Sequence, residues 1–141
     1  MNDPVQLDAL YFVAPQLVEQ DLVTLKKMGF ERVINNRPDH EVDDQPLGSD
    51  LQKAADLLGM EYISNPIDLA HLSQSHVGLQ GESLSVDKKT IAFCRTGTRS
   101  SVLWVLLNNA KGKDYKELVS FVSAKGFDLL RCASAMDPLS R

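Results

Sequence analysis

Cys94 and Arg99 have the clearest chemical potential in this chain, because they enclose a short polar segment between two apolar runs. The sequence there reads TIAFCRTGTRSSVLWVLLNN, from Thr90 to Asn109. A thiolate is a strong nucleophile, and the planar guanidinium group of arginine binds two oxygens of one anion at once. This pairing predicts a site where a sulfur atom attacks an electrophilic phosphorus or sulfur atom of an anion.

The segment that follows Cys94 is expected to cradle that anion. Gly97 permits a tight turn that directs several backbone N–H groups toward one point. The start of the next helix adds unpaired N–H donors and the positive end of the helix dipole. This positive field stabilises a thiolate over a thiol. The expected anion-binding residues are Arg95, Thr96, Gly97, Thr98 and Ser100, together with Arg37 at the end of another expected strand.

Alternating strands and helices are expected to position these residues. Short runs of apolar residues predict strands at 10–16, 31–36, 61–67 and 90–94. Helical spacing predicts helices at 18–28, 49–58, 73–86, 98–110 and 114–126, and a last helix from about residue 128. Ser49 and Gln52 predict a capping box for the second helix. The alternation predicts an α/β fold with a mostly parallel sheet of four to five strands and helices on both faces.

The two ends of such a sheet differ, because ligands bind at the carboxyl ends of parallel strands. Cys94 ends one expected strand and Arg37 follows another, so both are expected at the same edge of the sheet. Asn35 and Asn36 are expected to hold the turn before Arg37 through side-chain to backbone hydrogen bonds. Trp104 and Cys132 lie in apolar surroundings and are expected to pack in the core.

Composition limits the class of protein. The chain has 141 residues, which suits a single domain over 1–141. Its net charge of −4 gives no general attraction to nucleic acid or to an anionic membrane, so neither partner is expected. The two cysteines and the absence of a signal-peptide pattern predict a reducing, cytoplasmic setting. No metal-ligand spacing occurs, so no metal or cofactor is expected, and the sequence leaves the oligomeric state open.

Several segments resemble one known family. YFVAPQ, GFERVINNRPDHE, DQP, AADLLGMEYISNPI, FCRTGTRS and LW are similar to the bacterial phosphatase-like family, which also occurs as a domain of β-lactamase-hydrolase-like proteins. The resemblance extends from Leu10 to Phe127. It implies a dual-specificity-phosphatase-like fold, a cysteine nucleophile and a phosphorylated or sulfur-containing anionic substrate.

The resemblance also implies a mechanism. Cys94 would attack phosphorus to form a phosphocysteine, while Arg99 and the loop N–H groups would hold the phosphate oxygens. Ser100 matches the phosphatase hydroxyl that helps the thiolate leave. Asp68, which follows a strand at the same edge, is the expected general acid, and His71 is the reserve candidate. Arg37 either extends the anion site or pairs with Glu41.

Three functions stay open at this point. The upstream sequence favours a cysteine-dependent phosphatase, because it lacks the signature of sulfurtransferases of the rhodanese type. Only four residues separate Cys94 from Arg99, however, one fewer than in true tyrosine phosphatases and the same number as in many rhodaneses. A sulfurtransferase that carries a persulfide on Cys94 is therefore the second hypothesis, and a non-catalytic oxyanion-binding module is the third.

Overall fold

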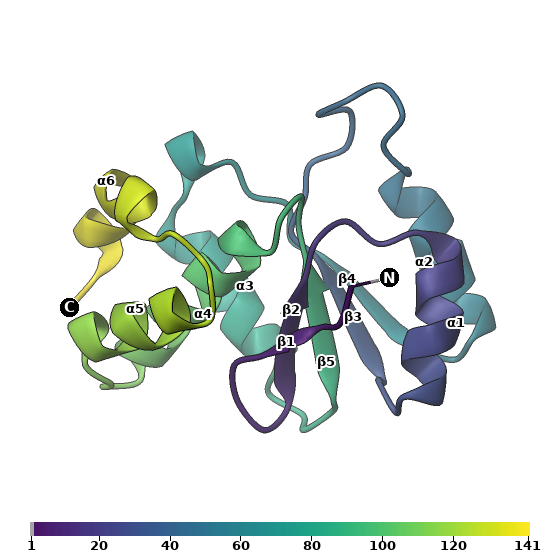
Figure 1. Ribbon diagram of the computed structural model, residues 1–141, viewed down its shortest axis with the longest axis horizontal. Coiled ribbons are helices and arrows are strands. Elements are labelled where there is room, and N and C mark those ends of the chain that lie inside the picture. The colour runs from purple at the N-terminus through teal and green to yellow at the C-terminus, as the bar shows by residue number, and fades with distance from the viewer. Residues whose placement is uncertain (1) are drawn as a thin grey trace.

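The structure is a computed structural model that describes residues 2–141, and a five-stranded sheet runs through its centre (Figure 1). The strands are β1 (Val5–Gln6), β2 (Tyr11–Ala14), β3 (Arg32–Asn35), β4 (Glu61–Ser64) and β5 (Thr90–Phe93). Their spatial order is β1-β2-β5-β3-β4. Strands β2, β5, β3 and β4 run parallel to one another, whereas β1 is antiparallel to β2. The predicted mostly parallel α/β architecture is confirmed.

Helices cover both faces of this sheet, as predicted. In Figure 1, α1 (Glu19–Lys27) and α2 (Gly48–Leu57) lie to the right of the strands. To the left lie α3 (Gln74–Ser83), α4 (Thr98–Ala110), α5 (Tyr115–Ala124) and α6 (Ala133–Met136). Three 3-10 turns complete the described residues: η1 (Leu69–His71), η2 (Leu130–Cys132) and η3 (Asp137–Leu139).

Two hydrophobic cores result, because successive side chains of a strand point to opposite faces of the sheet. Ile91 and Phe93 of β5 pack with the buried side chains of α1 and α2. Ala92, which lies between them, packs in the larger core with α4, α5 and the C-terminal turns. The strand that delivers Cys94 is thus fixed from both sides, and its last residue, Phe93, is fully buried.

Helix α4 is the central helix of the larger core. It is buried on most of its faces. This burial explains why its residues are apolar in a continuous run and not only along one face of the helix. It packs against α3 on one side and α5 on the other. No helix within residues 2–141 combines the length and hydrophobicity needed to cross a lipid bilayer. The predicted bounds of α4, residues 98–110, are confirmed.

Two expectations about local structure were wrong, and one strand was not foreseen. Strand β1 was not predicted, because it is a two-residue edge strand without a recognisable pattern. The capping box at Ser49 does not form: the helix begins at Gly48, whose N–H donates to the carboxylate of Asp39 at 2.8 Å. The last predicted helix is divided into η2, α6 and η3, and Pro138 lies within η3 rather than beyond the end.

Candidate active site

The loop between β5 and α4 is shaped by Gly97, the residue before the helix. Gly97 has φ of +96°, in the left-handed region that side chains other than hydrogen disfavour. A Cβ atom placed there would also lie 2.8 Å from Cε1 of Phe127, which contacts the loop from beyond α5. Both the backbone angle and the close approach require glycine, so the turn predicted from the sequence is a fixed feature.

Cys94 lies at the floor of this loop. Its sulfur accepts a hydrogen bond from the backbone N–H of Gly97 at 3.1 Å, and its own N–H donates to Ala14 at 3.4 Å. The loop therefore directs the N–H group of Gly97 at the sulfur. The residue is fully buried, with no exposed surface. The sulfur thus lies beneath the loop rather than open to solvent.

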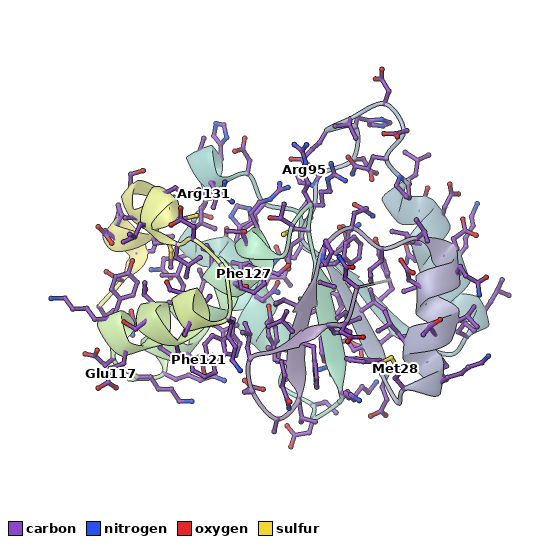
Figure 2. The ribbon with its side chains drawn as sticks, in the orientation of Figure 1. Met28, Arg95, Glu117, Phe121, Phe127 and Arg131 are labelled. Atoms are coloured by element: carbon purple, nitrogen blue, oxygen red, sulfur yellow. The ribbon has the colours of Figure 1, made fainter. Side chains whose placement is uncertain are left out.

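A pocket of about 420 Å³ lies over the loop and is strongly cationic. It is lined by Arg95, Thr96, Thr98 and Arg99 from the predicted anion loop, with Leu69 and Arg131. In Figure 2, Arg95 and Arg131 both lie in the upper part of the view, and Phe127 lies below and between them. Arg131 was not predicted as a site residue, because nothing in its local sequence indicates that η2 returns to the loop.

Arg99 is held in one orientation by Glu41. Its Nη1 and Nη2 atoms each donate to a different oxygen of Glu41 at 2.8 Å, and Nη1 also donates to the carbonyl of Ile67 at 3.0 Å. An arginine has five N–H donors. The two that remain, on Nε and on the inner side of Nη2, form a second planar edge. We therefore expect an oxyanion to bind at that edge of the guanidinium group while Glu41 stays bound to the Nη1–Nη2 edge.

The charges around Arg99 reinforce one another. Burial opposes the charged form of Arg99, yet its hydrogen bonds to Glu41 and the attraction of a Cys94 thiolate raise the pKa of Arg99 above its usual value. Hydrogen bonding from Arg99 lowers the pKa of Glu41 to about 2; burial opposes this shift, and Arg37 adds to it. Both groups are ionised at neutral pH, and Glu41 bridges two arginines. The sequence indicated only its pairing with Arg37.

Two predicted anion ligands instead support the site from behind. Arg37 is buried, and its side chain donates to Glu41 at 2.8 Å and to Gln16 at 3.0 Å. Of its two open roles, the ion pair with Glu41 is therefore the one present. Ser100 is fully buried, and its hydroxyl donates to Asn36 rather than to Cys94. Neither residue is among those that line the pocket, and direct contact of either one with an anion stays a prediction.

A buried network of amides and hydroxyls joins α4 to the sheet. The carboxamide oxygen of Asn36 accepts from Ser100 at 2.9 Å and from Gln80 of α3 at 3.0 Å. Gln80 also donates to the hydroxyl of Tyr11, which donates to the backbone carbonyl of Ser100. The predicted tie of Asn36 to the backbone is present as a bond to the carbonyl of Asn65. The network fixes the first turn of α4, and thus the loop that precedes it.

Asp68 directly precedes Leu69, which lines the pocket. It caps η1 by accepting from the N–H of Ala70 at 3.0 Å, and it lies 3.2 Å from Nδ1 of His71. The bond from Ala70, then that from His71, and the nearby charge of Arg99 lower the pKa of Asp68. These contacts favour the ionised carboxylate. The expected acid and the reserve candidate therefore lie side by side, and both are largely exposed.

The two core predictions are confirmed. Trp104 is buried, and its indole N–H donates to Asp8 at 2.8 Å. Cys132 is also buried, and burial raises the pKa of its thiol. A buried thiol whose protonated form is favoured is a poor nucleophile. Cys132 therefore differs from Cys94, which has a donor on its sulfur and arginines above it.

Comparison with known proteins agrees with this arrangement. Residues 6–111 match the model of the phosphatase-like domain of beta-lactamase hydrolase-like proteins. A beta-lactamase hydrolase-like protein of Agrobacterium fabrum is 29% identical over 132 residues, which is 92% of this chain. The match covers only 30% of the length of that relative.

Solved structures with the same fold include phosphatases. A putative phosphatase from Neisseria meningitidis has a TM-score of 0.81 and 26% identity, over 95% of this chain and 96% of its own. A cysteine-to-serine variant of TpbA from P. aeruginosa, in complex with pTyr, has a TM-score of 0.69 and 15% identity, over 96% and 86% of the two chains. The chain therefore belongs to the phosphatase-like domain family of beta-lactamase hydrolase-like proteins, as its sequence motifs indicated.

Proposed function

We propose that this chain is a cysteine-dependent phosphatase that hydrolyses phosphate monoesters through a phosphocysteine on Cys94. One observation carries the proposal: the sulfur of Cys94 accepts the Gly97 N–H at 3.1 Å beneath a pocket lined by three arginines. A positive field of this kind favours both a thiolate and a bound dianion. The pTyr bound to a TpbA variant of the same fold supports a phosphorylated substrate.

The proposed reaction has two steps. The thiolate of Cys94 attacks phosphorus, a sulfur–phosphorus bond forms, and the bond to the leaving oxygen breaks while Asp68 donates a proton to that oxygen. Water then attacks phosphorus, the sulfur–phosphorus bond breaks, and inorganic phosphate and the thiolate are released. Asp68 accepts the proton of the water. The free edge of Arg99 and the N–H groups of the loop stabilise the charge on the phosphate oxygens in both steps.

Two features of the site set conditions on this mechanism. Because Cys94 is fully buried, the atoms that cover its sulfur must move aside for phosphorus to reach it. Because its contacts favour the ionised form of Asp68, the acid must gain its proton when the substrate binds. A dianionic phosphate opposes a second negative charge nearby and thereby favours protonation of that carboxyl group.

The test is hydrolysis of 4-nitrophenyl phosphate by the intact protein and by Cys94→Ser, with Cys132→Ala as the matched control. We expect turnover by the intact protein and by Cys132→Ala, and none by Cys94→Ser. Acid quenching followed by mass spectrometry should show one phosphoryl group on a peptide that contains Cys94. Undiminished turnover by Cys94→Ser would overturn the proposal.

Sulfur transfer is the second candidate, because the four-residue spacing from Cys94 to Arg99 is found in many rhodaneses. In that reaction the thiolate takes the outer sulfur of thiosulfate, sulfite leaves, and the persulfide passes its sulfur to a thiol acceptor. A stable added sulfur on Cys94 after thiosulfate treatment, absent from Cys94→Ala, would favour this function. If neither reaction occurs and phosphate still raises the melting temperature, the chain is an oxyanion-binding module.

A further inference from the structure

We infer that the pocket takes a phosphate monoester that carries a second anionic group, and that Arg131 binds this second group. The inference rests on the proposed function, because it assigns the first phosphate to Cys94 and Arg99. It adds a ligand-binding residue outside the loop and a substrate class. Three features of the protein support it: the charges in the pocket, the placement of Arg131 and the cavity beside it.

The positive charge of the pocket comes from two separate elements, the loop and η2. Of the arginines that line it, Arg99 is ion-paired with Glu41. Within residues 2–141, neither Arg95 nor Arg131 forms an ion pair with an acidic side chain. Like charges held close together repel, and a bound anion relieves that repulsion. Two arginines without acidic partners, on different elements beside the same cradle, therefore favour an anionic ligand that reaches both of them.

Arg131 belongs to a different element from the loop, yet it reaches the same pocket. It lies on η2, and its Nη2 is 3.5 Å from the hydroxyl oxygen of Thr98. That hydroxyl is in turn 3.0 Å from the hydroxyl of Thr96. The nearest acid in sequence, Asp128, accepts the N–H of Leu130 instead of pairing with Arg131. The guanidinium group thus stays available for a ligand at the edge of the cradle.

The space beyond Arg131 fits the body of such a ligand. A second cavity, of about 390 Å³, lies between η1 and the C-terminal turns. It shares Leu69 and Arg131 with the cationic pocket, and its other lining residues include Leu72, Pro138 and Leu139. Arg131 therefore lies where a cationic pocket meets a partly apolar one. This arrangement favours an organic phosphate whose second anionic group is displaced from the first.

Binding of two phosphonates to the Cys94→Ser protein tests the inference without requiring turnover. Phenylphosphonate offers one anionic group, and 1,4-phenylenediphosphonate offers two on the same ring. We expect calorimetry at low salt to show that the diphosphonate binds about ten-fold more tightly, as a charge-assisted hydrogen bond to the exposed Arg131 predicts. A third probe, 4-phosphonobenzoate, distinguishes a carboxylate from a phosphate as the second group.

Variants at two arginines then assign the effect. Arg131→Gln should reduce the preference for the diphosphonate to about two-fold or less and leave phenylphosphonate binding unchanged, whereas Arg131→Lys should retain part of the preference. Arg141→Gln, which removes an arginine outside the pocket, should leave both affinities unchanged. Equal affinity of the two probes for the starting protein, or equal losses for both in Arg131→Gln, would overturn the inference.

The experiments distinguish a failure of this inference from a failure of the proposed function. If no aryl phosphate is hydrolysed by the intact protein but the diphosphonate preference depends on Arg131, the chain binds doubly anionic ligands without phosphatase activity. If turnover depends on Cys94 and the preference is absent, the phosphatase proposal stands and this inference is wrong.

Discussion

Replacing Glu41 with glutamine should lower the free energy of unfolding, because it removes a carboxylate that pairs with two arginines. Glu41 accepts from Arg99 at 2.8 Å through both of its oxygens and from Nε of Arg37 at 2.8 Å. The side chains of the two arginines are only 14% and 4% exposed, respectively. Glutamine keeps the shape but removes the negative charge, so both guanidinium groups lose their counter-ion.

The size of the effect follows from the pKa of Glu41, which falls from 4.5 to about 2 on folding. At about 1.4 kcal/mol per pKa unit, this difference corresponds to roughly 3 kcal/mol. The side chain is 30% exposed, and solvent screening reduces the expected loss to about 1–2 kcal/mol. Since the pKa is lowered in the folded state, the stabilisation is fully present above about pH 5. It is lost as the pH falls toward 2.

Urea unfolding at pH 7 and pH 3 measures this contribution as the difference in unfolding free energy between the original chain and Glu41→Gln. The difference should be about 1–2 kcal/mol at pH 7 and clearly smaller at pH 3. Glu31→Gln, which removes an exposed carboxylate without an ion pair among residues 2–141, is the matched control and should differ little at either pH. An unchanged deficit of Glu41→Gln at pH 3 would refute the reasoning.

Three other substitutions test the loop, the acid and the buried network. Gly97→Ala should lower the melting temperature and abolish the rise in melting temperature that added phosphate causes, because Gly97 has φ of +96° and a Cβ there would meet Phe127. Gly78→Ala, where no atom lies within 4 Å of the added Cβ, is the control and should raise the melting temperature. Asp68→Asn should reduce kcat/KM about 100-fold for phenyl phosphate but hardly for 4-nitrophenyl phosphate, whose leaving group needs no proton; equal losses would exclude the acid role. Gln80→Leu should cost about 1–3 kcal/mol in urea unfolding, because Gln80 is fully buried and its neighbours lose their partners; a neutral result would mean that the network is dispensable.

The fold was readable from the sequence where packing and local pattern agree. Helix α4 was predicted with its observed bounds, because Gly97 forms a turn immediately before the helix and an apolar run defines the length of the helix. The start of α2 was predicted one residue late and its capping box was wrong, because the N–H of Gly48 is bonded by Asp39, nine residues earlier in the chain. The 3-10 turns near residue 130 were also missed, since their short segments lack a helical period long enough to distinguish them from a helix.

The site was readable only where its parts are neighbours in sequence. The loop from Cys94 to Thr98 could be recognised from residue types and spacing. The bond between Arg99 and Glu41 spans 58 residues, and the contact between Arg131 and Thr98 spans 33. Such contacts depend on how the long connection after β3 and the C-terminal turns fold back over the sheet. A single sequence carries no local signal for that return.

The ring of Phe127 against Gly97 has a consequence for the smallest working unit of this protein. The loop, its strand and its helix all lie before residue 111, yet the ring that braces the glycine comes from the last 30 residues of the 141. A shortened chain that stops after α4 would keep the thiol and Arg99 but lose this brace. Engineers who transplant the loop into another scaffold need to supply an aromatic side chain behind it.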